Sequence, residues 1–179
     1  MRPIVSGIHE LFQYIRAIKD APEQFRPEQC PHCGRKGVRC HGHYDRKADR
    51  VNPANSTLNP IWIFRFYCSA CKRTCSVLPE CIPPRRWYLW KVQQAILLLC
   101  LSPVSQHQIS QQFSPSRWTI SRWHSRLVMR FNEYSSYLKS AFSWLGYTSG
   151  FIEFWQTCLS KCRLSTAMLR LNNSGVFIP

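Results

Sequence analysis

Two pairs of cysteines, each with two residues between the partners, constrain the fold of this chain more than any other feature. The sequence reads Cys30-Pro-His-Cys33 and, further along, Cys68-Ser-Ala-Cys71. Such a pair forms a tight turn that brings two thiolates to one ion, and two turns complete a tetrahedral Zn²⁺ shell of four sulfurs. Gly34 suits the backbone turn that lets amides point at the sulfurs. The sequence therefore predicts a zinc site formed by Cys30, Cys33, Cys68 and Cys71.

The residues between the two cysteine pairs have the pattern of a β-hairpin. Segments 38–44 and 61–67 are predicted strands, the second rich in β-branched and aromatic side chains, and a third short strand is expected at 74–78. The connecting loop, 46–60, is rich in Asn, Pro and Ser, and a flexible loop tolerates such an insertion at little entropic cost. These features predict a zinc ribbon with a small antiparallel sheet over residues 28–80.

Other cysteines and histidines near the two pairs leave the ligand set open. Those that could replace a ligand or hold a second ion are Cys40, His41, His43, Cys75 and Cys81. Cys75 and Cys81 fit better as small buried hydrophobic groups, and His32 and His43 as surface groups or hydrogen-bond partners of ligands. The pattern His41-Gly-His43 also resembles the paired histidines of rolling-circle nucleases, although those have a hydrophobic residue where this chain has glycine.

Segment 105–130 has the pattern of the last two helices of a helix-turn-helix. Ser114-Pro115 is a helix start signal, with Ser as the N-cap and Pro at the first helical position. On that register Phe113 and Trp118 occupy the two positions of a hydrophobic staple. The buried stripe of the second helix, spaced by three and four residues, is expected to be Ile120, Trp123 and Leu127.

The opposite face of this helix combines guanidinium groups with short hydroxyls, which is the chemistry of major-groove readout. The helix residues expected to contact DNA are Arg117, Trp118, Thr119, Ser121, Arg122, Ser125 and Arg126. Arg85 and Arg86, at the start of the preceding helix, are expected to add contacts. The alternative is an ordinary surface helix with a solvated basic face.

The charge of the chain favours a polyanionic partner. The formal net charge is +15, from 24 Lys and Arg against 9 Asp and Glu in 179 residues, and nucleic acid is the usual partner of such a protein. Between Cys81 and Asn132 there are seven basic residues and no acidic one. A basic membrane-surface protein would need a segment that divides Lys and Arg sharply from aliphatic residues, and none is present. Double-stranded DNA is therefore the expected partner.

The sequence contains no evident secretory or membrane segment. The first apolar positions are interrupted by His9, Glu10 and Gln13, unlike a signal peptide. The longest unbroken apolar run, 95–101, is far too short to span a bilayer. The protein is expected to be cytoplasmic and associated with the nucleoid, where its ten cysteines hold metal or are buried rather than forming disulfides.

Helices are expected on both sides of the two motifs. Residues 6–20 read as an amphipathic helix capped by Ser6. Its apolar face is predicted to be Ile8, Leu11, Phe12, Ile15 and Ile18. Residues 79–84 (PECIPP) read as a linker, and a helix from there to about Leu101 is the predicted first helix of a trihelical unit.

The remaining residues, 131–179, are predicted to be a helical extension. Helices are expected at 131–145 and 151–171, in a tail with ten aromatic residues and two acids. This tail would pack against the trihelical unit or form the surface of a homodimer or another partner. The predicted fold class is α+β, with an N-terminal helix over 1–27, the zinc ribbon, an all-α helix-turn-helix domain over 85–130, and this extension.

Three short segments give the chain a resemblance to a known group of proteins: CPHCG, YCSACKRT and TISRW. Together they resemble the N-terminal DNA-binding region of bacterial insertion-sequence transposases and the short stand-alone zinc-binding proteins that such elements encode. The resemblance covers residues 28–130. It implies that the four paired cysteines bind zinc, and that Arg117, Ser121 and Arg122 contact bases of the element's terminal DNA.

The acidic residues separate this chain from the common transposases, which cut DNA with three carboxylates that hold two Mg²⁺ ions. The only Asp residues are Asp20, Asp45 and Asp49, and the only acids beyond Glu80 are Glu133 and Glu153. No such carboxylate set can be assembled from them. The chain is therefore expected to be a non-catalytic, sequence-specific DNA-binding protein of mobile-element origin, partnered by a separate catalytic transposase or recombinase subunit.

Three alternatives remain open from the sequence. One is a small DNA nuclease or strand-transferase that uses His41, His43 and a tyrosine such as Tyr44 or Tyr88. Another is a transcriptional regulator derived from a transposase. The third is an RNA-binding or protein-interaction module that reuses the ribbon, against which the helix-turn-helix pattern weighs.

Overall fold

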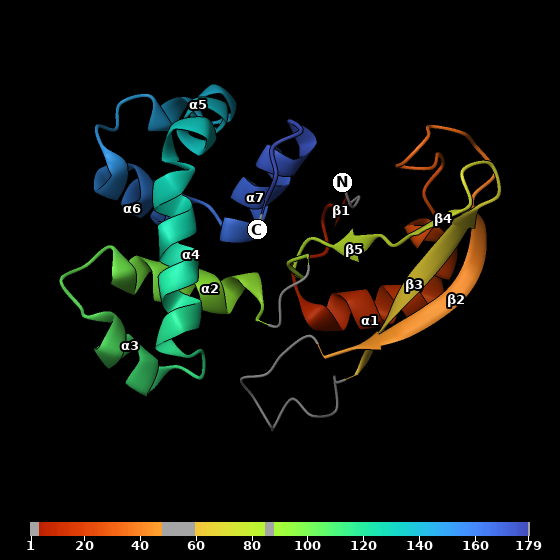
Figure 1. Cartoon of the computed structure of the whole chain (residues 1–179), viewed down its shortest axis with the longest axis horizontal. Coiled ribbons are helices and arrows are strands. Elements are labelled where there is room, and N and C mark those ends of the chain that lie inside the picture. The colour runs from red at the N-terminus through yellow and green to blue at the C-terminus, as the bar shows by residue number, and fades with distance from the viewer. Residues whose placement is uncertain (1–3, 48–59, 85–87, 179) are drawn as a thin grey trace. The chain divides into compact units, whose positions relative to one another are not determined.

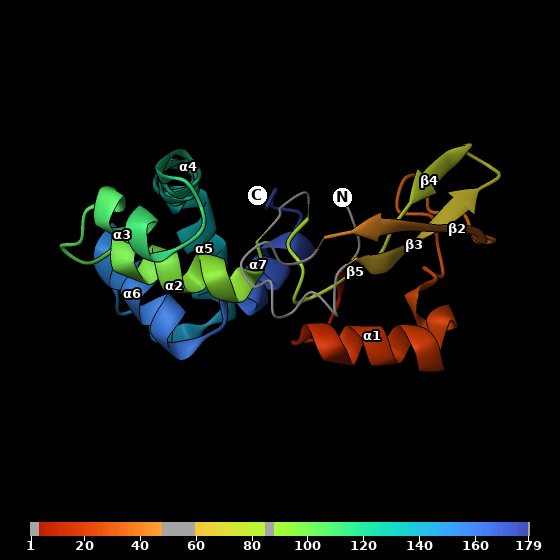
Figure 2. The same cartoon turned by 90° about the horizontal axis from the view of Figure 1, so that it is seen from below.

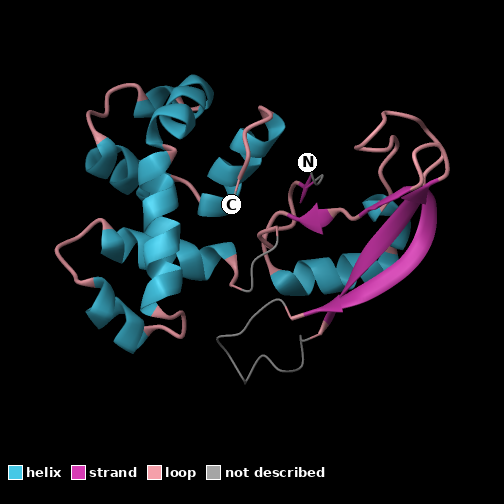
Figure 3. Cartoon of the chain, in the orientation of Figure 1, coloured by secondary structure: helices cyan, strands magenta, loops and turns pink. Residues whose placement is uncertain are grey.

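The computed structural model describes residues 4–47, 60–84 and 88–178. The chain divides into two units, Met1–Leu89 and Trp90–Pro179. All described strands belong to the first unit, and the described elements of the second are helical (Figure 3). The predicted α+β fold class is confirmed: the described residues form a small antiparallel sheet and seven α-helices. None of these helices is long and apolar enough to cross a membrane.

The first unit contains five strands, one α-helix and one 3₁₀ turn among its described residues. They are β1 (Ile4–Val5), α1 (Leu11–Asp20), η1 (Pro22–Phe25), β2 (Arg39–Arg46), β3 (Ile61–Cys68), β4 (Arg73–Cys75) and β5 (Leu78–Pro79). Strands β2, β3 and β4 form an antiparallel sheet in that order, and β1 pairs with β5 in parallel. The hairpin predicted from the sequence is confirmed, but the predicted third strand is divided between β4 and β5, which lie in different sheets.

Helix α1 begins later than the sequence predicts, and its predicted apolar face is confirmed except at one residue: Leu11 and Ile18 are buried, and Ile8 and Ile15 pack against the core. Its N-cap is Glu10, which forms a capping box with Gln13, and residues 6–9, where the first turn was expected, are not helical. The prediction that Phe12 is buried is wrong, because its side chain is 62% exposed. Tyr14 is buried instead, and its hydroxyl donates to the carbonyl oxygen of Trp62 at 2.9 Å. That bond supplies the partner that a buried tyrosine needs.

Helix α1 and the three-stranded sheet share one hydrophobic core, with the helix along one side of the sheet (Figure 2). The buried residues of this core include Leu11, Tyr14, Ile18, Val38, Ile61, Ile63 and Phe66. The predicted linker is part of the same unit: Cys81 and Ile82 are buried in this core. The Glu80 amide also donates to the Val5 carbonyl oxygen at 3.0 Å. Segment 79–84 is therefore core structure, and the prediction of a linker there was wrong.

The second unit is built from six α-helices and a 3₁₀ turn among its described residues (Figure 1). They are α2 (Trp90–Cys100), α3 (Gln106–Gln112), α4 (Arg117–Met129), α5 (Phe131–Ala141), η3 (Ser143–Leu145), α6 (Phe151–Lys161) and α7 (Leu164–Asn173). Helices α2, α3 and α4 contact one another, α2 contacts α6 and α7, and α5 contacts α7. Tyr134, Phe154 and Trp155 are fully buried. The aromatic tail therefore packs within the unit, as one of the two interpretations of the sequence expected.

A glutamine from α2 divides the last helical stretch, which the sequence predicts as one helix over 151–171. The Gln94 side-chain amide donates to the carbonyl oxygens of Leu159 at 2.7 Å and Cys162 at 3.3 Å. Its oxygen accepts from the Leu164 amide at 2.8 Å. One side chain thus satisfies backbone groups at the end of α6 and the start of α7, groups that lack partners at helix termini.

We expect the Gln94→Leu variant to be less stable than the wild type by about 1–3 kcal/mol, because it leaves these backbone groups without partners. Urea unfolding followed by circular dichroism measures the change. Gln112→Leu is the matched control, since Gln112 is exposed at the end of α3. Equal midpoints for the two variants would show that the Gln94 bonds contribute no net stability.

Candidate metal centre and nucleic-acid interface

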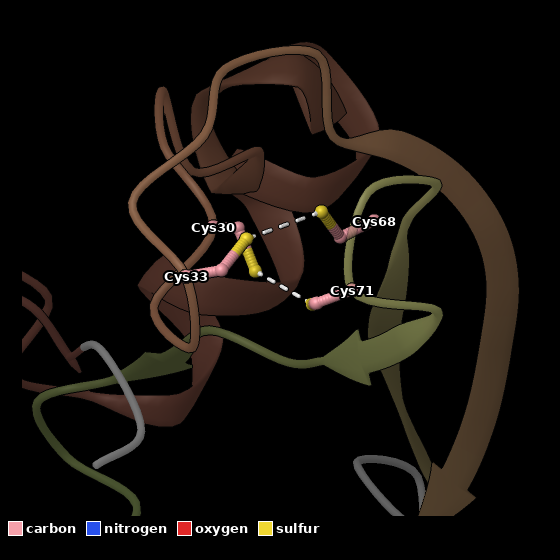
Figure 4. A group of neighbouring side chains, drawn as sticks. All are labelled: Cys30, Cys33, Cys68 and Cys71. Atoms are coloured by element: carbon pink, nitrogen blue, oxygen red, sulfur yellow. Dashed lines mark hydrogen bonds between the residues drawn. The ribbon is translucent and has the colours of Figure 1, made fainter.

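The four paired cysteines lie together at one end of the first unit (Figure 4). Cys30 and Cys33 come from the turn before β2, and Cys68 and Cys71 from the turn between β3 and β4. The Sγ atoms of Cys30 and Cys71 are 3.6 Å apart, those of Cys33 and Cys68 are 3.7 Å apart, and all four lie within 4.8 Å of one another. Residues far apart in the sequence are thus brought to one point.

The distances between these sulfurs fit a tetrahedral metal shell. Four thiolates at the usual Zn–S distance would lie about 3.8 Å apart along each edge of the tetrahedron. Two of the pairs come close to this edge already. Among the described residues, these cysteines are the one group of three or more Cys, His, Asp or Glu whose ligand atoms lie close enough to hold a metal ion. The group could therefore bind a metal ion such as zinc.

Both cysteine turns depend on a residue in the left-handed backbone region. Gly34 has φ +71° and directly follows Cys33. In the second turn the corresponding position is held by Lys72, with φ +55°, the one non-glycine residue of positive φ in the part of the chain described. In the first turn the His32 amide also donates to the Cys30 sulfur at 3.5 Å. Such amide contacts stabilise negative charge on sulfur.

The pKa values of the two thiols in the second turn indicate why the four-cysteine group would favour a bound cation. The Cys71 backbone amide donates to the Cys68 sulfur and lowers the pKa of that thiol. The pKa of the Cys71 thiol is raised, first by desolvation and then by the neighbouring thiols. Once one cysteine of the group is a thiolate, a second thiolate beside it is therefore unfavourable unless a cation is bound. A divalent ion would supply the positive charge that lets all four cysteines become thiolates.

The structure also separates the other ligand candidates from this group. Cys75 and Cys81 are buried, as predicted, with 8% and 7% of their surface exposed. Burial raises the pKa of the Cys81 thiol to about 12, so it is a neutral packing group. Cys40 is exposed on β2, outside the cluster.

The two histidines of the His-Gly-His pattern lie against different aromatic rings. His41 lies against Tyr67, with ring centroids 5.7 Å apart, and His43 against Trp62 at 4.7 Å. A register shift lies between Cys40 and His43, where Gly42 has φ +77°, the geometry of a β-bulge. Tyr67 and Trp62 lie five positions apart on β3. The bulge lies between the two histidines, and each imidazole contacts a different ring.

Helices α3 and α4 have the connectivity predicted for a helix-turn-helix, with segment 113–116 between them. Ser105 caps α3 through a capping box with Gln108. The predicted start of α4 was wrong by two residues: the N-cap is Ser116, whose Oγ accepts from the Thr119 amide at 3.4 Å. The predicted buried stripe of α4 is confirmed, since Ile120, Trp123 and Leu127 are at most 5% exposed.

The shift in the start of α4 removes the predicted hydrophobic staple. Trp118 is 77% exposed and therefore cannot be one of its two packed partners. With Ser116 as the N-cap, the two staple positions are Pro115 and Ile120, and both side chains are buried. Trp118 lies instead on the surface of the first turn of α4, where a side chain expected to contact DNA would have to be.

The predicted DNA contacts divide into exposed and half-buried groups. The exposed ones are Arg117, Trp118, Arg122 and Ser125, and the half-buried ones are Thr119, Ser121 and Arg126. The Thr119 hydroxyl lies 3.2 Å from the Ser116 hydroxyl, so it belongs to the cap of the helix. Arg85 and Arg86 lie outside the described residues.

One family model matches a stretch of the chain that contains the four paired cysteines, helix α3 and the first half of α4. Residues 30–123, just over half of the 179-residue chain, match the family described as Domain of unknown function (DUF6431). The match runs from the first cysteine of the cluster to Trp123 of α4. The chain belongs to this family. No curated protein and no solved structure matches the chain.

Proposed function

We propose that this chain is a non-catalytic, sequence-specific protein that binds double-stranded DNA through α4. The observation that carries the proposal is the division of α4 into two faces. Its apolar stripe is buried against the rest of the unit, while Arg117, Arg122 and Ser125 are exposed. In helix-turn-helix proteins the second helix enters the major groove, and residues of its N-terminal half contact base edges. Arg117 and Arg122 occupy that half of α4.

The local charge supports DNA as the partner. The sequence between Cys81 and Asn132 contains basic residues but no acidic residue, so no carboxylate of this segment opposes a phosphate backbone. Cationic side chains near phosphates release counterions from DNA, which supplies most non-specific affinity. The arginines of α4 combine this attraction with two parallel donors that match guanine.

Zinc is the proposed ion of the four-cysteine group. A Zn²⁺ bound by four thiolates has no open coordination position, so its contribution is to hold the two cysteine turns together. The first unit would then be a zinc ribbon, as in the transposase DNA-binding regions that the sequence resembles. That resemblance also supports a mobile-element origin and a separate catalytic subunit as partner. If there is no such subunit, the alternative is a transcriptional regulator derived from a transposase.

The nuclease alternative receives less support from the geometry. A metal-dependent nuclease with paired histidines needs both imidazoles at one ion. Here His41 and His43 lie against different rings, Tyr67 and Trp62, and neither belongs to the described group of residues whose ligand atoms lie close enough to hold a metal ion. This arrangement favours the non-catalytic proposal.

Selection from a random pool of double-stranded DNA tests the proposal directly. The full-length, zinc-loaded protein should enrich a defined motif at near-physiological salt, and a palindromic motif would indicate a homodimer. Enrichment of no motif, with affinity that collapses as salt rises, would mean that the basic residues bind only the phosphate backbone. That outcome would contradict sequence-specific recognition.

A further inference from the structure

An aromatic cluster on the ribbon sheet is not used by the zinc site or by the proposed duplex contact. We call it the aromatic face and define it as His43, Trp62 and Phe64. The His43 ring lies 4.7 Å from the Trp62 ring at 31° and 6.3 Å from the Phe64 ring at 71°. His43 and Phe64 are directly paired across β2 and β3. All three side chains therefore belong to one face of the hairpin.

The aromatic face lies opposite the side of the sheet that α1 covers. Ile61 and Ile63 are buried in the core that they share with α1, and strand alternation directs Trp62, between them, to the other side. Further along β3, Phe66 is buried in the core shared with α1 and Phe64 packs partly against that core, so the alternation holds only at the Trp62 end of the strand. The exposed part of this face is thus its Trp62 end, where Trp62 is 53% exposed.

The exposed indole is held in place by its neighbours. A large aromatic side chain exposed without packing would be mobile, but the His43 ring, tilted by 31°, packs against one side of Trp62. Cross-strand aromatic pairs of this kind also stabilise a hairpin. The result is a flat, pre-oriented ring surface, which is what an unpaired base needs for stacking.

The sheet that carries the aromatic face has a net positive charge. The described residues of the sheet and its turns, 39–47 and 60–75, contain six basic side chains and one acid, Asp45, a net charge of +5. The basic residues are Arg39, Arg46, Lys47, Arg65, Lys72 and Arg73. Two of them have partners elsewhere in the unit: Arg46 donates to the Pro83 carbonyl oxygen, and Arg65 lies over the Tyr44 ring. Asp45 is paired with Trp62 across the strands, so the single negative charge of this region lies beside the indole.

We infer that the aromatic face binds single-stranded DNA, with an unpaired base stacked on Trp62 and the cations of the sheet near the phosphates. Base stacking on aromatic side chains within a cationic surface is the general mode of sequence-tolerant single-strand binding. An apolar protein partner would not require the net positive charge of the sheet. The choice of DNA over RNA rests on the proposed function, whereas the stacking itself does not.

Binding of a fluorescently labelled oligo(dT) to the full-length, zinc-loaded protein tests this inference by anisotropy. The Trp62→Ala variant should bind about 5- to 150-fold more weakly than the wild type, the loss typical of one stacked base. Phe12→Ala is the matched control, because Phe12 is also an exposed aromatic of the first unit, 62% exposed on α1. Asp45→Asn should tighten binding, since it removes the negative charge beside the indole.

A reciprocal experiment distinguishes the proposed duplex contact of α4 from the single-strand contact at Trp62. Trp62→Ala should leave binding to the selected duplex unchanged, and Arg122→Ala should leave oligo(dT) binding unchanged. Equal affinity of Trp62→Ala and Phe12→Ala for oligo(dT) would overturn the inference. Tighter binding of oligo(rU) than oligo(dT) would overturn the assignment to DNA. A Trp62→Ala variant that loses only self-association in sedimentation would identify the face as a contact between copies.

Discussion

The Cys68→Ser variant should lose the folded structure of the first unit while the second unit stays folded. Structural zinc sites contribute about 10–16 kcal/mol of apparent binding free energy in small zinc peptides, and that energy is available only to the folded state. Loss of even about 3 kcal/mol would lower the melting temperature of a small unit by roughly 12–24 °C, at about 4–8 °C per kcal/mol. Removal of zinc by a chelator should have the same effect on the wild type.

Zinc content and thermal unfolding together measure this effect. Wild-type protein should contain one zinc ion per chain, and Cys68→Ser should contain less and melt earlier. Cys40→Ser is the matched control, because Cys40 is exposed on β2 of the same unit and lies outside the cluster. If the chelated protein kept its melting transition and Cys68→Ser matched Cys40→Ser, the four-cysteine group would not be a structural metal site.

The features predicted well from the sequence are those specified by local patterns. The strand that begins at Ile61 was located from its alternating β-branched and aromatic residues, and β3 indeed begins there. The stripe at Ile120, Trp123 and Leu127 follows from helical periodicity alone. The meeting of the two cysteine pairs follows from their spacing, because each pair is a self-contained turn that needs only one partner.

The features that were missed depend on contacts between distant residues. No glycine or proline marks the break between α6 and α7, which Gln94 stabilises from α2, 65 or more positions earlier in the chain. The start of α1 is displaced because the residues of the expected first turn bind the distant segment 80–81: the Gly7 amide donates to the Glu80 carboxylate at 3.3 Å, and the Ile8 carbonyl oxygen accepts from the Cys81 amide at 3.1 Å. A local pattern contains no information about either partner, so the sequence predicts an uninterrupted helix in one place and a longer helix in the other.

The start of α4 was missed for a different reason, since two local signals compete there. Ser114-Pro115 and Ser116 both fit the pattern of a helix start. Packing decides between them: Pro115 is buried before the helix begins, and Ser116 is the N-cap. This choice has a functional consequence, because it leaves Trp118 exposed on the same helix as Arg122. The proposed DNA-binding surface therefore contains the Trp118 ring, which is a predicted contact, beside the predicted arginines.

Arg122→Ala should weaken binding to the selected DNA motif by about 1–3 kcal/mol, and the loss should be confined to one base position. The physical reason is that a guanidinium can donate two parallel hydrogen bonds to guanine, which no other base accepts in the same way. Repeating the selection with the variant measures the loss at each position. Arg170→Ala is the matched control, since Arg170 is an exposed arginine of the same unit on α7.

The salt dependence of binding distinguishes the two ways in which Arg122 could contribute. If Arg122 contacts a phosphate, the variant should bind all sequences more weakly and the salt slope should decrease by about one. If it reads a base, the motif should relax at one position while the slope stays close to that of Arg170→Ala. An unchanged motif and an unchanged slope would remove Arg122 from the interface. The recognition surface would then have to be sought on other residues of α4, beginning with Arg117 and Trp118, which are exposed in its first turn.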